Sequence, residues 1–241
     1  MGDSMKGRKM ARRFLERIRL AVAGFVLVAA CAPQSTPNQP PSGFESLFDG
    51  QDLAGWARHT NLPGHGLAGK WTVEDGTIVA MQDPPGKGGF LCTAGEFRDF
   101  ELRLEARIDW PFDSGVFLRV GPDGKSHQVT LDYRPGGEIG GIYCPWTRGH
   151  VHHCPEGIKY FKKNKWNKLR IICQGQPPRI HVWLNDTLIT DFQHSEKSTS
   201  GIPEAGAICL QVHPGARGYE QSKARFRNIF IRQISPPQNG R

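Results

Sequence analysis

The chain has 241 residues, of which 31 are Lys or Arg and 23 are Asp or Glu, so its formal net charge is +8. Residues 1–30 carry +5 of this charge and residues 31–241 only +3, which argues against nucleic acid as a partner, because such a domain needs a basic surface of its own. All 18 prolines and 26 of the 29 glycines follow residue 30. This density of turn formers argues against a helical bundle and predicts short strands joined by turns.

We expect residues 1–30 to be a targeting signal rather than part of the fold. A basic stretch ends at Arg19, an apolar run covers Leu20–Ala30, and Cys31 follows. The run is too short to span a bilayer as a helix, but it suits the apolar core of a secretory signal. The junction Val28-Ala-Ala-Cys31 resembles the bacterial lipobox, in which Cys31 is lipidated and becomes the first residue of the mature protein. A short buried helix that ends in cysteine is the alternative.

The lipobox resemblance predicts a protein of the bacterial cell envelope, held to the membrane by acyl chains on Cys31. Ala32 follows the cysteine where an Asp would signal inner-membrane retention, so the analogy favours the outer membrane or periplasm. Residues 31–43 are rich in proline and uncharged, which is typical of a semi-extended tether. Residues 44–234 then form the expected domain, and residues 235–241 a C-terminal tail.

Strand-like alternation fills the region from residue 44 to residue 234. Trp71–Glu74 and Thr77–Ala80 flank Asp75-Gly76, a two-residue turn typical of a β-hairpin. Phe100–Ile108 alternates apolar and charged residues with a period of two. The same alternation occurs in five more segments: Gly115–Val120, Gln128–Tyr133, Ile180–Leu184, Ile208–Val212 and Ala224–Ile231. No window keeps a helical period, so the sequence predicts an all-β fold, a two-sheet antiparallel β-sandwich or jelly roll.

Alternation also sorts the side chains of three strands into an inner and an outer face. Successive residues of a strand point to opposite sides, so an apolar set directed to the core leaves its polar neighbours on the other side. If Val129 and Leu131 point to the core, then Gln128 and Asp132 point outward. In the same way, Arg119 points outward if the core takes Val116, Leu118 and Val120. The third strand is predicted to direct Ile208, Leu210 and Val212 to the core. Its outward residues are then Cys209, Gln211 and His213. Ordinary solvent-facing polar residues are the alternative, but Arg and His are not typical fillers of strands.

Seven motifs occur in an order that resembles a known family. They are Phe48–Trp56, Asp113-Ser-Gly-Val-Phe-Leu-Arg119, Gly140-Gly-Ile-Tyr143, Lys165–Lys168, Trp183–Asp186, Leu210-Gln-Val-His213 and Phe226–Ile229. Together they are similar to the 3-keto-disaccharide hydrolase domain, from about Phe44 to Ile234. The resemblance implies a concanavalin A-like jelly roll that cleaves glycosides already oxidised at C3. It also implies an upstream glucoside 3-dehydrogenase that supplies the substrate.

Two positions depart from the family pattern. The family usually has Asn where this chain has Asp113, and it commonly has Glu where this chain has Gln128. An amide cannot act as a general base, so Gln128 weakens the case for hydrolysis and favours a second hypothesis, a non-catalytic, lectin-like glycan-binding lipoprotein. A binding module is usually attached to a catalytic partner, which favours the enzyme.

The chemistry that the resemblance implies assigns roles to the outward face. A C3 ketone acidifies the C2 proton, so that a base can remove it while the C1 substituent leaves. His213 fits the base by its ordinary pKa, and Asp132 is the second candidate or the orienting partner. Arg119 fits a cationic clamp on the enolate, and Gln128 and Gln211 fit hydroxyl binding. A conventional glycosidase needs two carboxylates, and only Asp132 is securely assigned to this face.

A second cluster combines histidines, cysteines and a tryptophan. His150, His152 and Trp146 are expected to line the sugar cleft, with Trp146 stacked on a pyranose. No cofactor is predicted, although His150, His152 and His153 are weak candidates for a divalent metal site. Without Cys31 the chain has five cysteines, an odd number that leaves at least one free thiol. The preferred disulfide is Cys144–Cys154.

Overall fold

The chain divides into two compact units, Met1–Ser35 and Thr36–Arg241. The computed structural model describes residues 38–61, 67–195, 201–215 and 219–235, all of them in the second unit. The expected signal and Cys31 lie outside the described residues, so the lipidation site stays a prediction. Within the described ranges, no helix is long and apolar enough to cross a membrane.

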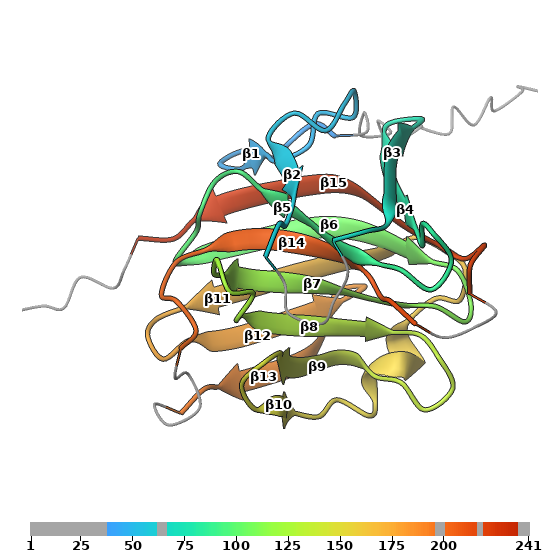
Figure 1. The fold of residues 1–241 in the computed structure, drawn as a ribbon. Helices are drawn as coiled ribbons and strands as arrows, with labels where there is room; N and C mark the ends of the chain where they lie inside the picture. Colours follow the sequence, from blue (N-terminus) through green and yellow to red (C-terminus); the bar gives the residue numbers. More distant parts are fainter. Residues whose placement is uncertain (1–37, 62–66, 196–200, 216–218, 236–241) are drawn as a thin grey trace, which may run out of the picture. The chain divides into compact units, whose positions relative to one another are not determined.

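The described residues form two antiparallel sheets stacked face to face (Figure 1). The eight-stranded sheet has the order β13 (Thr187–Gln193), β12 (Arg179–Leu184), β11 (Asn167–Gln174), β6 (Phe100–Ile108), β15 (Lys223–Gln233), β4 (Thr77–Met81) and β3 (Lys70–Glu74), and β1 (Glu45–Ser46) pairs with β15. The seven-stranded sheet has the order β10 (Gly149–His152), β9 (Ile139–Cys144), β8 (His127–Asp132), β7 (Asp113–Val120), β14 (Ala207–Val212), β5 (Gly89–Thr93) and β2 (Trp56–Arg58). A short 3₁₀ helix, η1, covers Gly157–Tyr160. The predicted all-β sandwich is confirmed.

The predicted hairpin joins β3 to β4 through Asp75 and Gly76. Both turn residues have left-handed backbones, with φ of 48° and 70°. Two such residues in succession match the right-handed twist of the flanking strands, which is why Asp-Gly is favoured there. The local sequence therefore favours this connection, and Nδ2 of Asn38 adds a hydrogen bond of 2.9 Å to the carbonyl oxygen of Gly76.

The core lies between the sheets and follows the alternation read from the sequence. Phe100, Leu102 and Leu104 of β6 are buried against the seven-stranded sheet, whose inward residues include Val129 and Leu131. Each fully buried side chain of this kind stabilises the fold by about 1.5–3 kcal/mol. Because the inward residues of β8 and β14 supply the apolar core, the outward positions of the same strands can hold polar side chains.

The disulfide of the domain differs from the expected one. Cys92 of β5 and Cys209 of β14 stand directly opposite each other in the register and are bonded. Cys144 and Cys154 are both free, so the Cys144–Cys154 prediction is wrong. Nearness in the sequence suggested that pair, whereas strand pairing brings together two cysteines 117 residues apart.

Candidate active site

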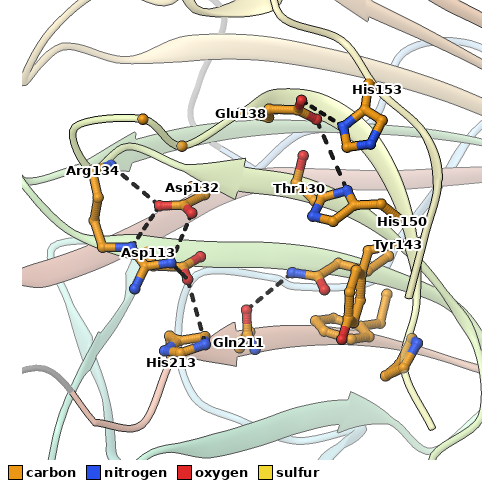
Figure 2. A pocket seen from close by; sticks show the side chains of 15 residues that line it. Asp113, Thr130, Asp132, Arg134, Glu138, Tyr143, His150, His153, Gln211 and His213 are labelled. Carbon is orange, nitrogen blue, oxygen red and sulfur yellow. Dashed lines mark hydrogen bonds and ion pairs between the residues drawn. The ribbon is translucent and has the colours of Figure 1, made fainter. Parts of the chain in front are cut away.

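A polar cavity lies on the outer face of the seven-stranded sheet, where β7, β8, β9, β10 and β14 run side by side. Its volume is about 400 Å³, within the range of small-molecule sites. The lining side chains come from these strands, from the β8–β9 turn and from the segments that follow β10 and β14 (Figure 2). They include Asp113, Phe117, Gln128, Thr130, Asp132, Arg134, Glu138, Tyr143, His150, His153, Gln211 and His213.

Two carboxylates and one arginine form the charged end of the cavity. Asp113 of β7 and Asp132 of β8 are direct partners in the strand register, so both side chains leave the sheet on the same face. Arg134 donates two hydrogen bonds of 2.7 Å to Asp132, from Nε and Nη2. Its Nη2 also lies 2.8 Å from Oδ2 of Asp113. The hydrogen bonds that Arg134 donates to Asp132 raise the pKa of Arg134, which therefore stays a cation.

Asp113 has the most perturbed carboxyl group of the cavity. Burial raises its pKa to about 7, the charge of Asp132 adds to the rise, and Arg134 opposes it. Nε2 of His213 lies 3.5 Å from Oδ2 of Asp113, as Figure 2 shows. A carboxylate that faces one imidazole nitrogen can hold the ring in place and leave the other nitrogen to accept a proton. A perturbed carboxyl group in a cavity also marks a functional site more often than a structural one.

An amide pair forms the middle of the cavity. Nε2 of Gln128 donates a hydrogen bond of 3.2 Å to Oε1 of Gln211, which links β8 to β14. Gly115 of β7 makes this possible, because a Cβ at that position would lie 2.4 Å from Nε2 of Gln128. The second N–H of Gln128 and the N–H groups of Gln211 suit sugar hydroxyls or a carbonyl oxygen.

Of the eight residues predicted from the sequence as catalytic or sugar-binding, the structure brings five together in the cavity and leaves three outside it: Trp146, His152 and Arg119. Gln128, Asp132, Gln211, His213 and His150 all line the cavity. Trp146 is not a lining residue and packs against Phe90, with ring centroids 6.4 Å apart. His152 packs against Phe192, 5.3 Å between centroids, because a register irregularity between His150 and His152 separates the two histidines.

Arg119 was expected on the outer face, and the structure overturns that expectation. Leu118 and Arg119 together oppose the single residue Ile208 of β14, and Arg119 has a left-handed backbone, with φ of 54°. This bulge reverses the alternation, so that Val120 joins the outer apolar cluster and Arg119 turns inward. The Arg119 side chain is 0 % exposed and pairs with Asp99 at 3.0 Å. It also donates to the carbonyl oxygens of Arg98 and Gly175, so Arg119 has a structural role.

Four lining residues were missed by the sequence analysis: Asp113, Arg134, Glu138 and Tyr143. Asp113 and Tyr143 lie in two of the seven motifs that resemble the family, so the sequence contained a signal for these two residues. Arg134 and Glu138 lie in the β8–β9 turn, where alternation does not apply. The cavity thus has three carboxylates, and the expectation of Asp132 alone was wrong.

One cluster on the cavity wall suits a divalent cation. The ligand atoms of Glu138, His150 and His153 lie within 4.8 Å of one another. Nδ1 of His153 lies 2.8 Å from Oε1 of Glu138, and Nδ1 of His150 lies 3.9 Å from Oε2. Two imidazoles and one carboxylate leave coordination positions open to a ligand. His152, also predicted as a metal ligand, is not part of this cluster.

Comparisons with known proteins place this chain in a family. Two-sheet sandwiches serve many unrelated functions, so the fold alone does not define the class. The chain belongs to the 3-keto-alpha-glucoside-1,2-lyase-like domain family, whose family model it matches over residues 43–232. It is 34% identical over 105 residues to the 3-keto-disaccharide hydrolase of Bacteroides thetaiotaomicron. That match covers 40% of this chain and 32% of the relative, so the chain spans about a third of the relative's length.

Solved structures show the same fold. Two crystal structures from Parabacteroides distasonis, provisionally described as glycosyl hydrolases, superpose with TM-scores of 0.58 and 0.55. They are 20% and 26% identical, covering 83% and 79% of this chain and 100% and 99% of those chains. A carbohydrate-binding module of Bacillus subtilis, CBM66, has a TM-score of 0.52 at 17% identity, covering 74% of this chain and 96% of the module.

Proposed function

We propose that the domain cleaves glycosides that carry a ketone at C3. In the reaction a base removes the C2 proton, and the electron pair of that bond forms a C2=C3 double bond while the C3 carbonyl becomes an enolate oxygen. When the C3 carbonyl re-forms, the pair moves to a C1=C2 double bond, the C1–O bond breaks and the departing oxygen takes a proton. Addition of water to the unsaturated product then gives net hydrolysis. The family match and the relative described as a 3-keto-disaccharide hydrolase support this substrate class.

We assign the base to His213. The observation that carries the proposal is the pairing of His213 with Asp113, a carboxyl group whose pKa burial raises to about 7. The carboxyl group of Asp113 lies beside Nε2 of His213 and orients the imidazole, which accepts the C2 proton. We assign the orienting role to Asp113 rather than to Asp132, whose two oxygens both accept hydrogen bonds from Arg134.

The other cavity residues supply the remaining needs of the reaction. Arg134, which replaces Arg119 in this role, is the cation beside the charge that develops on the enolate. Gln128 and Gln211 bind the sugar through their amides. The Tyr143 hydroxyl lines the cavity and suits protonation of the departing oxygen. The loss of the usual family Glu at Gln128 does not leave the cavity without a carboxylate, since Asp113 provides one.

An assay of the purified chain tests the proposal. We expect turnover of a 3-keto-glucoside or of 3-keto-trehalose, with a primary isotope effect at deuterated C2 if proton removal limits the rate. His213→Ala should lose about 10²–10⁴-fold in rate, the usual contribution of a positioned base. The control is His181→Ala, since His181 of β12 pairs with Asp191 away from the cavity and should leave the rate unchanged.

The alternatives give different outcomes in the same assay. Near-normal turnover by His213→Ala contradicts the base assignment. Turnover of an unoxidised glucoside at a similar rate indicates a conventional glycosidase, which needs two of the three cavity carboxylates. Binding of the 3-keto-glycoside with no turnover by the wild type indicates a glycan-binding protein.

We also propose that the domain is held at the bacterial cell envelope through acyl chains on Cys31. The lipobox-like sequence and the proline-rich segment that follows it support this proposal. Cys31→Ser should leave an uncleaved or soluble precursor. Normal processing and membrane association of that variant would rule out the lipid anchor.

A further inference from the structure

A second metal-capable cluster lies between the sheets, apart from the cavity. It consists of His127 of β8, Cys144 of β9 and His194, which follows β13 of the opposite sheet. Their ligand atoms lie within 4.8 Å of one another. All three residues are buried, with 1 %, 0 % and 2 % exposure. The proposed reaction uses none of them.

His127 has an unexplained environment. Both of its ring nitrogens are buried, and neither has a hydrogen-bond partner among the described residues. A buried polar atom without a partner costs about 1–3 kcal/mol, so such atoms usually mark a missing ligand or ion. Its ring lies 4.9 Å from the ring of His194, edge to face, and one of its nitrogens lies within 4.8 Å of Cys144 Sγ and of a His194 nitrogen.

His194 is arranged as a metal ligand would be. Its Nδ1 lies 3.3 Å from the carbonyl oxygen of Ser195, a contact that places the ring proton on Nδ1. The lone pair of Nε2 is then directed at Cys144 Sγ, 3.5 Å away. A carbonyl that fixes the tautomer of a histidine is the usual outer partner of a metal-bound imidazole.

A thiol-to-imidazole hydrogen bond would account for Cys144 and His194 but not for His127. A metal ion engages all three: it takes one nitrogen from each imidazole, including one of the two unpartnered nitrogens of His127, and the sulfur as thiolate, whose proton leaves to solvent. We therefore propose that His127, Cys144 and His194 bind one thiophilic cation, Cu(I) or Zn(II). The donor set of two nitrogens and one sulfur, without oxygen, selects these ions over Mg²⁺ or Ca²⁺.

The position of this site connects it with the cavity. His127 and Cys144 are next to Gln128 and Tyr143, which point to the opposite face of the same strands and line the cavity. An ion bound between the sheets fixes β8 and β9 against the end of β13. It would hold the strands that build the cavity without touching the substrate.

Titration of the metal-free full chain with Co²⁺ tests the proposal, because thiolate ligation gives an intense near-ultraviolet charge-transfer band. We expect a thiolate band that saturates at one Co²⁺ per chain and disappears when Zn²⁺ or Cu(I) displaces the Co²⁺. Cys144→Ser should abolish the band, and Cys173→Ser, which removes another buried free thiol, should leave it unchanged. The double variant His150→Ala/His153→Ala should also keep the band, because the cavity cluster has no sulfur.

Two results would overturn the proposal: no thiolate band in the wild type, or a band that survives Cys144→Ser. If Cys144→Ser does not fold, X-ray absorption of the Zn²⁺-loaded wild type decides instead. One sulfur and two nitrogens in the first coordination sphere support the site, and a sphere without sulfur contradicts it.

Discussion

Asp113 combines burial with charge, and this combination makes the stability of the domain depend on pH. Burial raises the pKa of Asp113 from 3.8 to about 7, so the folded state binds its proton more tightly than the unfolded state. Below about pH 4 the carboxyl is protonated in both states. Between about pH 4 and pH 7 the unfolded state ionises first, so the free energy of unfolding falls with rising pH, and above pH 7 the loss is constant.

Asp113→Asn removes this titration. We expect the unfolding free energy of the variant to exceed that of the wild type by more at pH 8 than at pH 5, and the two differences to differ by at most about 3 kcal/mol. Urea unfolding of both proteins at the two pH values measures the difference. Equal pH dependence in variant and wild type would mean that Asp113 ionises normally. Activity should fall in the same variant, because His213 loses its carboxylate partner.

The sequence allowed a prediction of which face a side chain occupies only where the backbone is regular. Alternation placed Gln128, Asp132, Gln211 and His213 correctly, since each lies in a regular strand or just beyond its end. It failed at Arg119, because one left-handed residue reverses the pattern and the sequence does not mark it. Arg134 and Glu138 could not be predicted, since a turn conformation depends on the strands that it joins.

At the level of elements, the bulge in β7 makes Arg119 a structural cation. Arg119→Met would leave the carboxylate of Asp99 buried without its main partner. Breaking a buried pair in this way costs about 3–5 kcal/mol of unfolding free energy. We expect that loss in chemical denaturation, with kcat/KM of the folded variant nearly unchanged.

The double variant Arg119→Met/Asp99→Asn is the matched control for this effect. It removes both charges, so part of the lost stability should return. The opposite pattern, a fold of normal stability and a rate reduced by orders of magnitude, would restore Arg119 to the active site.

At the level of the whole molecule, the fold was predictable and the pairing of cysteines was not. Alternation and turn residues act locally, so the sequence was sufficient for the sandwich and for the hairpin of β3 and β4. The Cys92–Cys209 bond depends on β5 lying beside β14, a contact between distant parts of the chain. The buried cluster of His127, Cys144 and His194 depends on the stacking of the two sheets in the same way.

The disulfide constrains a long loop of the unfolded chain, so its removal should cost stability. For Cys92→Ser/Cys209→Ser we expect a loss of about 2–4 kcal/mol in unfolding free energy. Peptide mapping of the non-reduced wild type should find Cys92 joined to Cys209. A Cys144–Cys154 peptide in that map would contradict the structure.

The alternation of β8 has a consequence for how this protein can diversify. Val129 and Leu131 point to the core, while Gln128, Thr130 and Asp132 point to the cavity, so neighbouring positions are subject to different selective pressures. Exchanges at the cavity positions alter sugar recognition while the core that keeps the domain folded stays the same. Asp113 and Gln128, the two departures from the family pattern, both lie on this outer side. A library randomised at the cavity positions of β8 and at Gln211 of β14 should therefore yield mostly folded proteins with altered substrate preference.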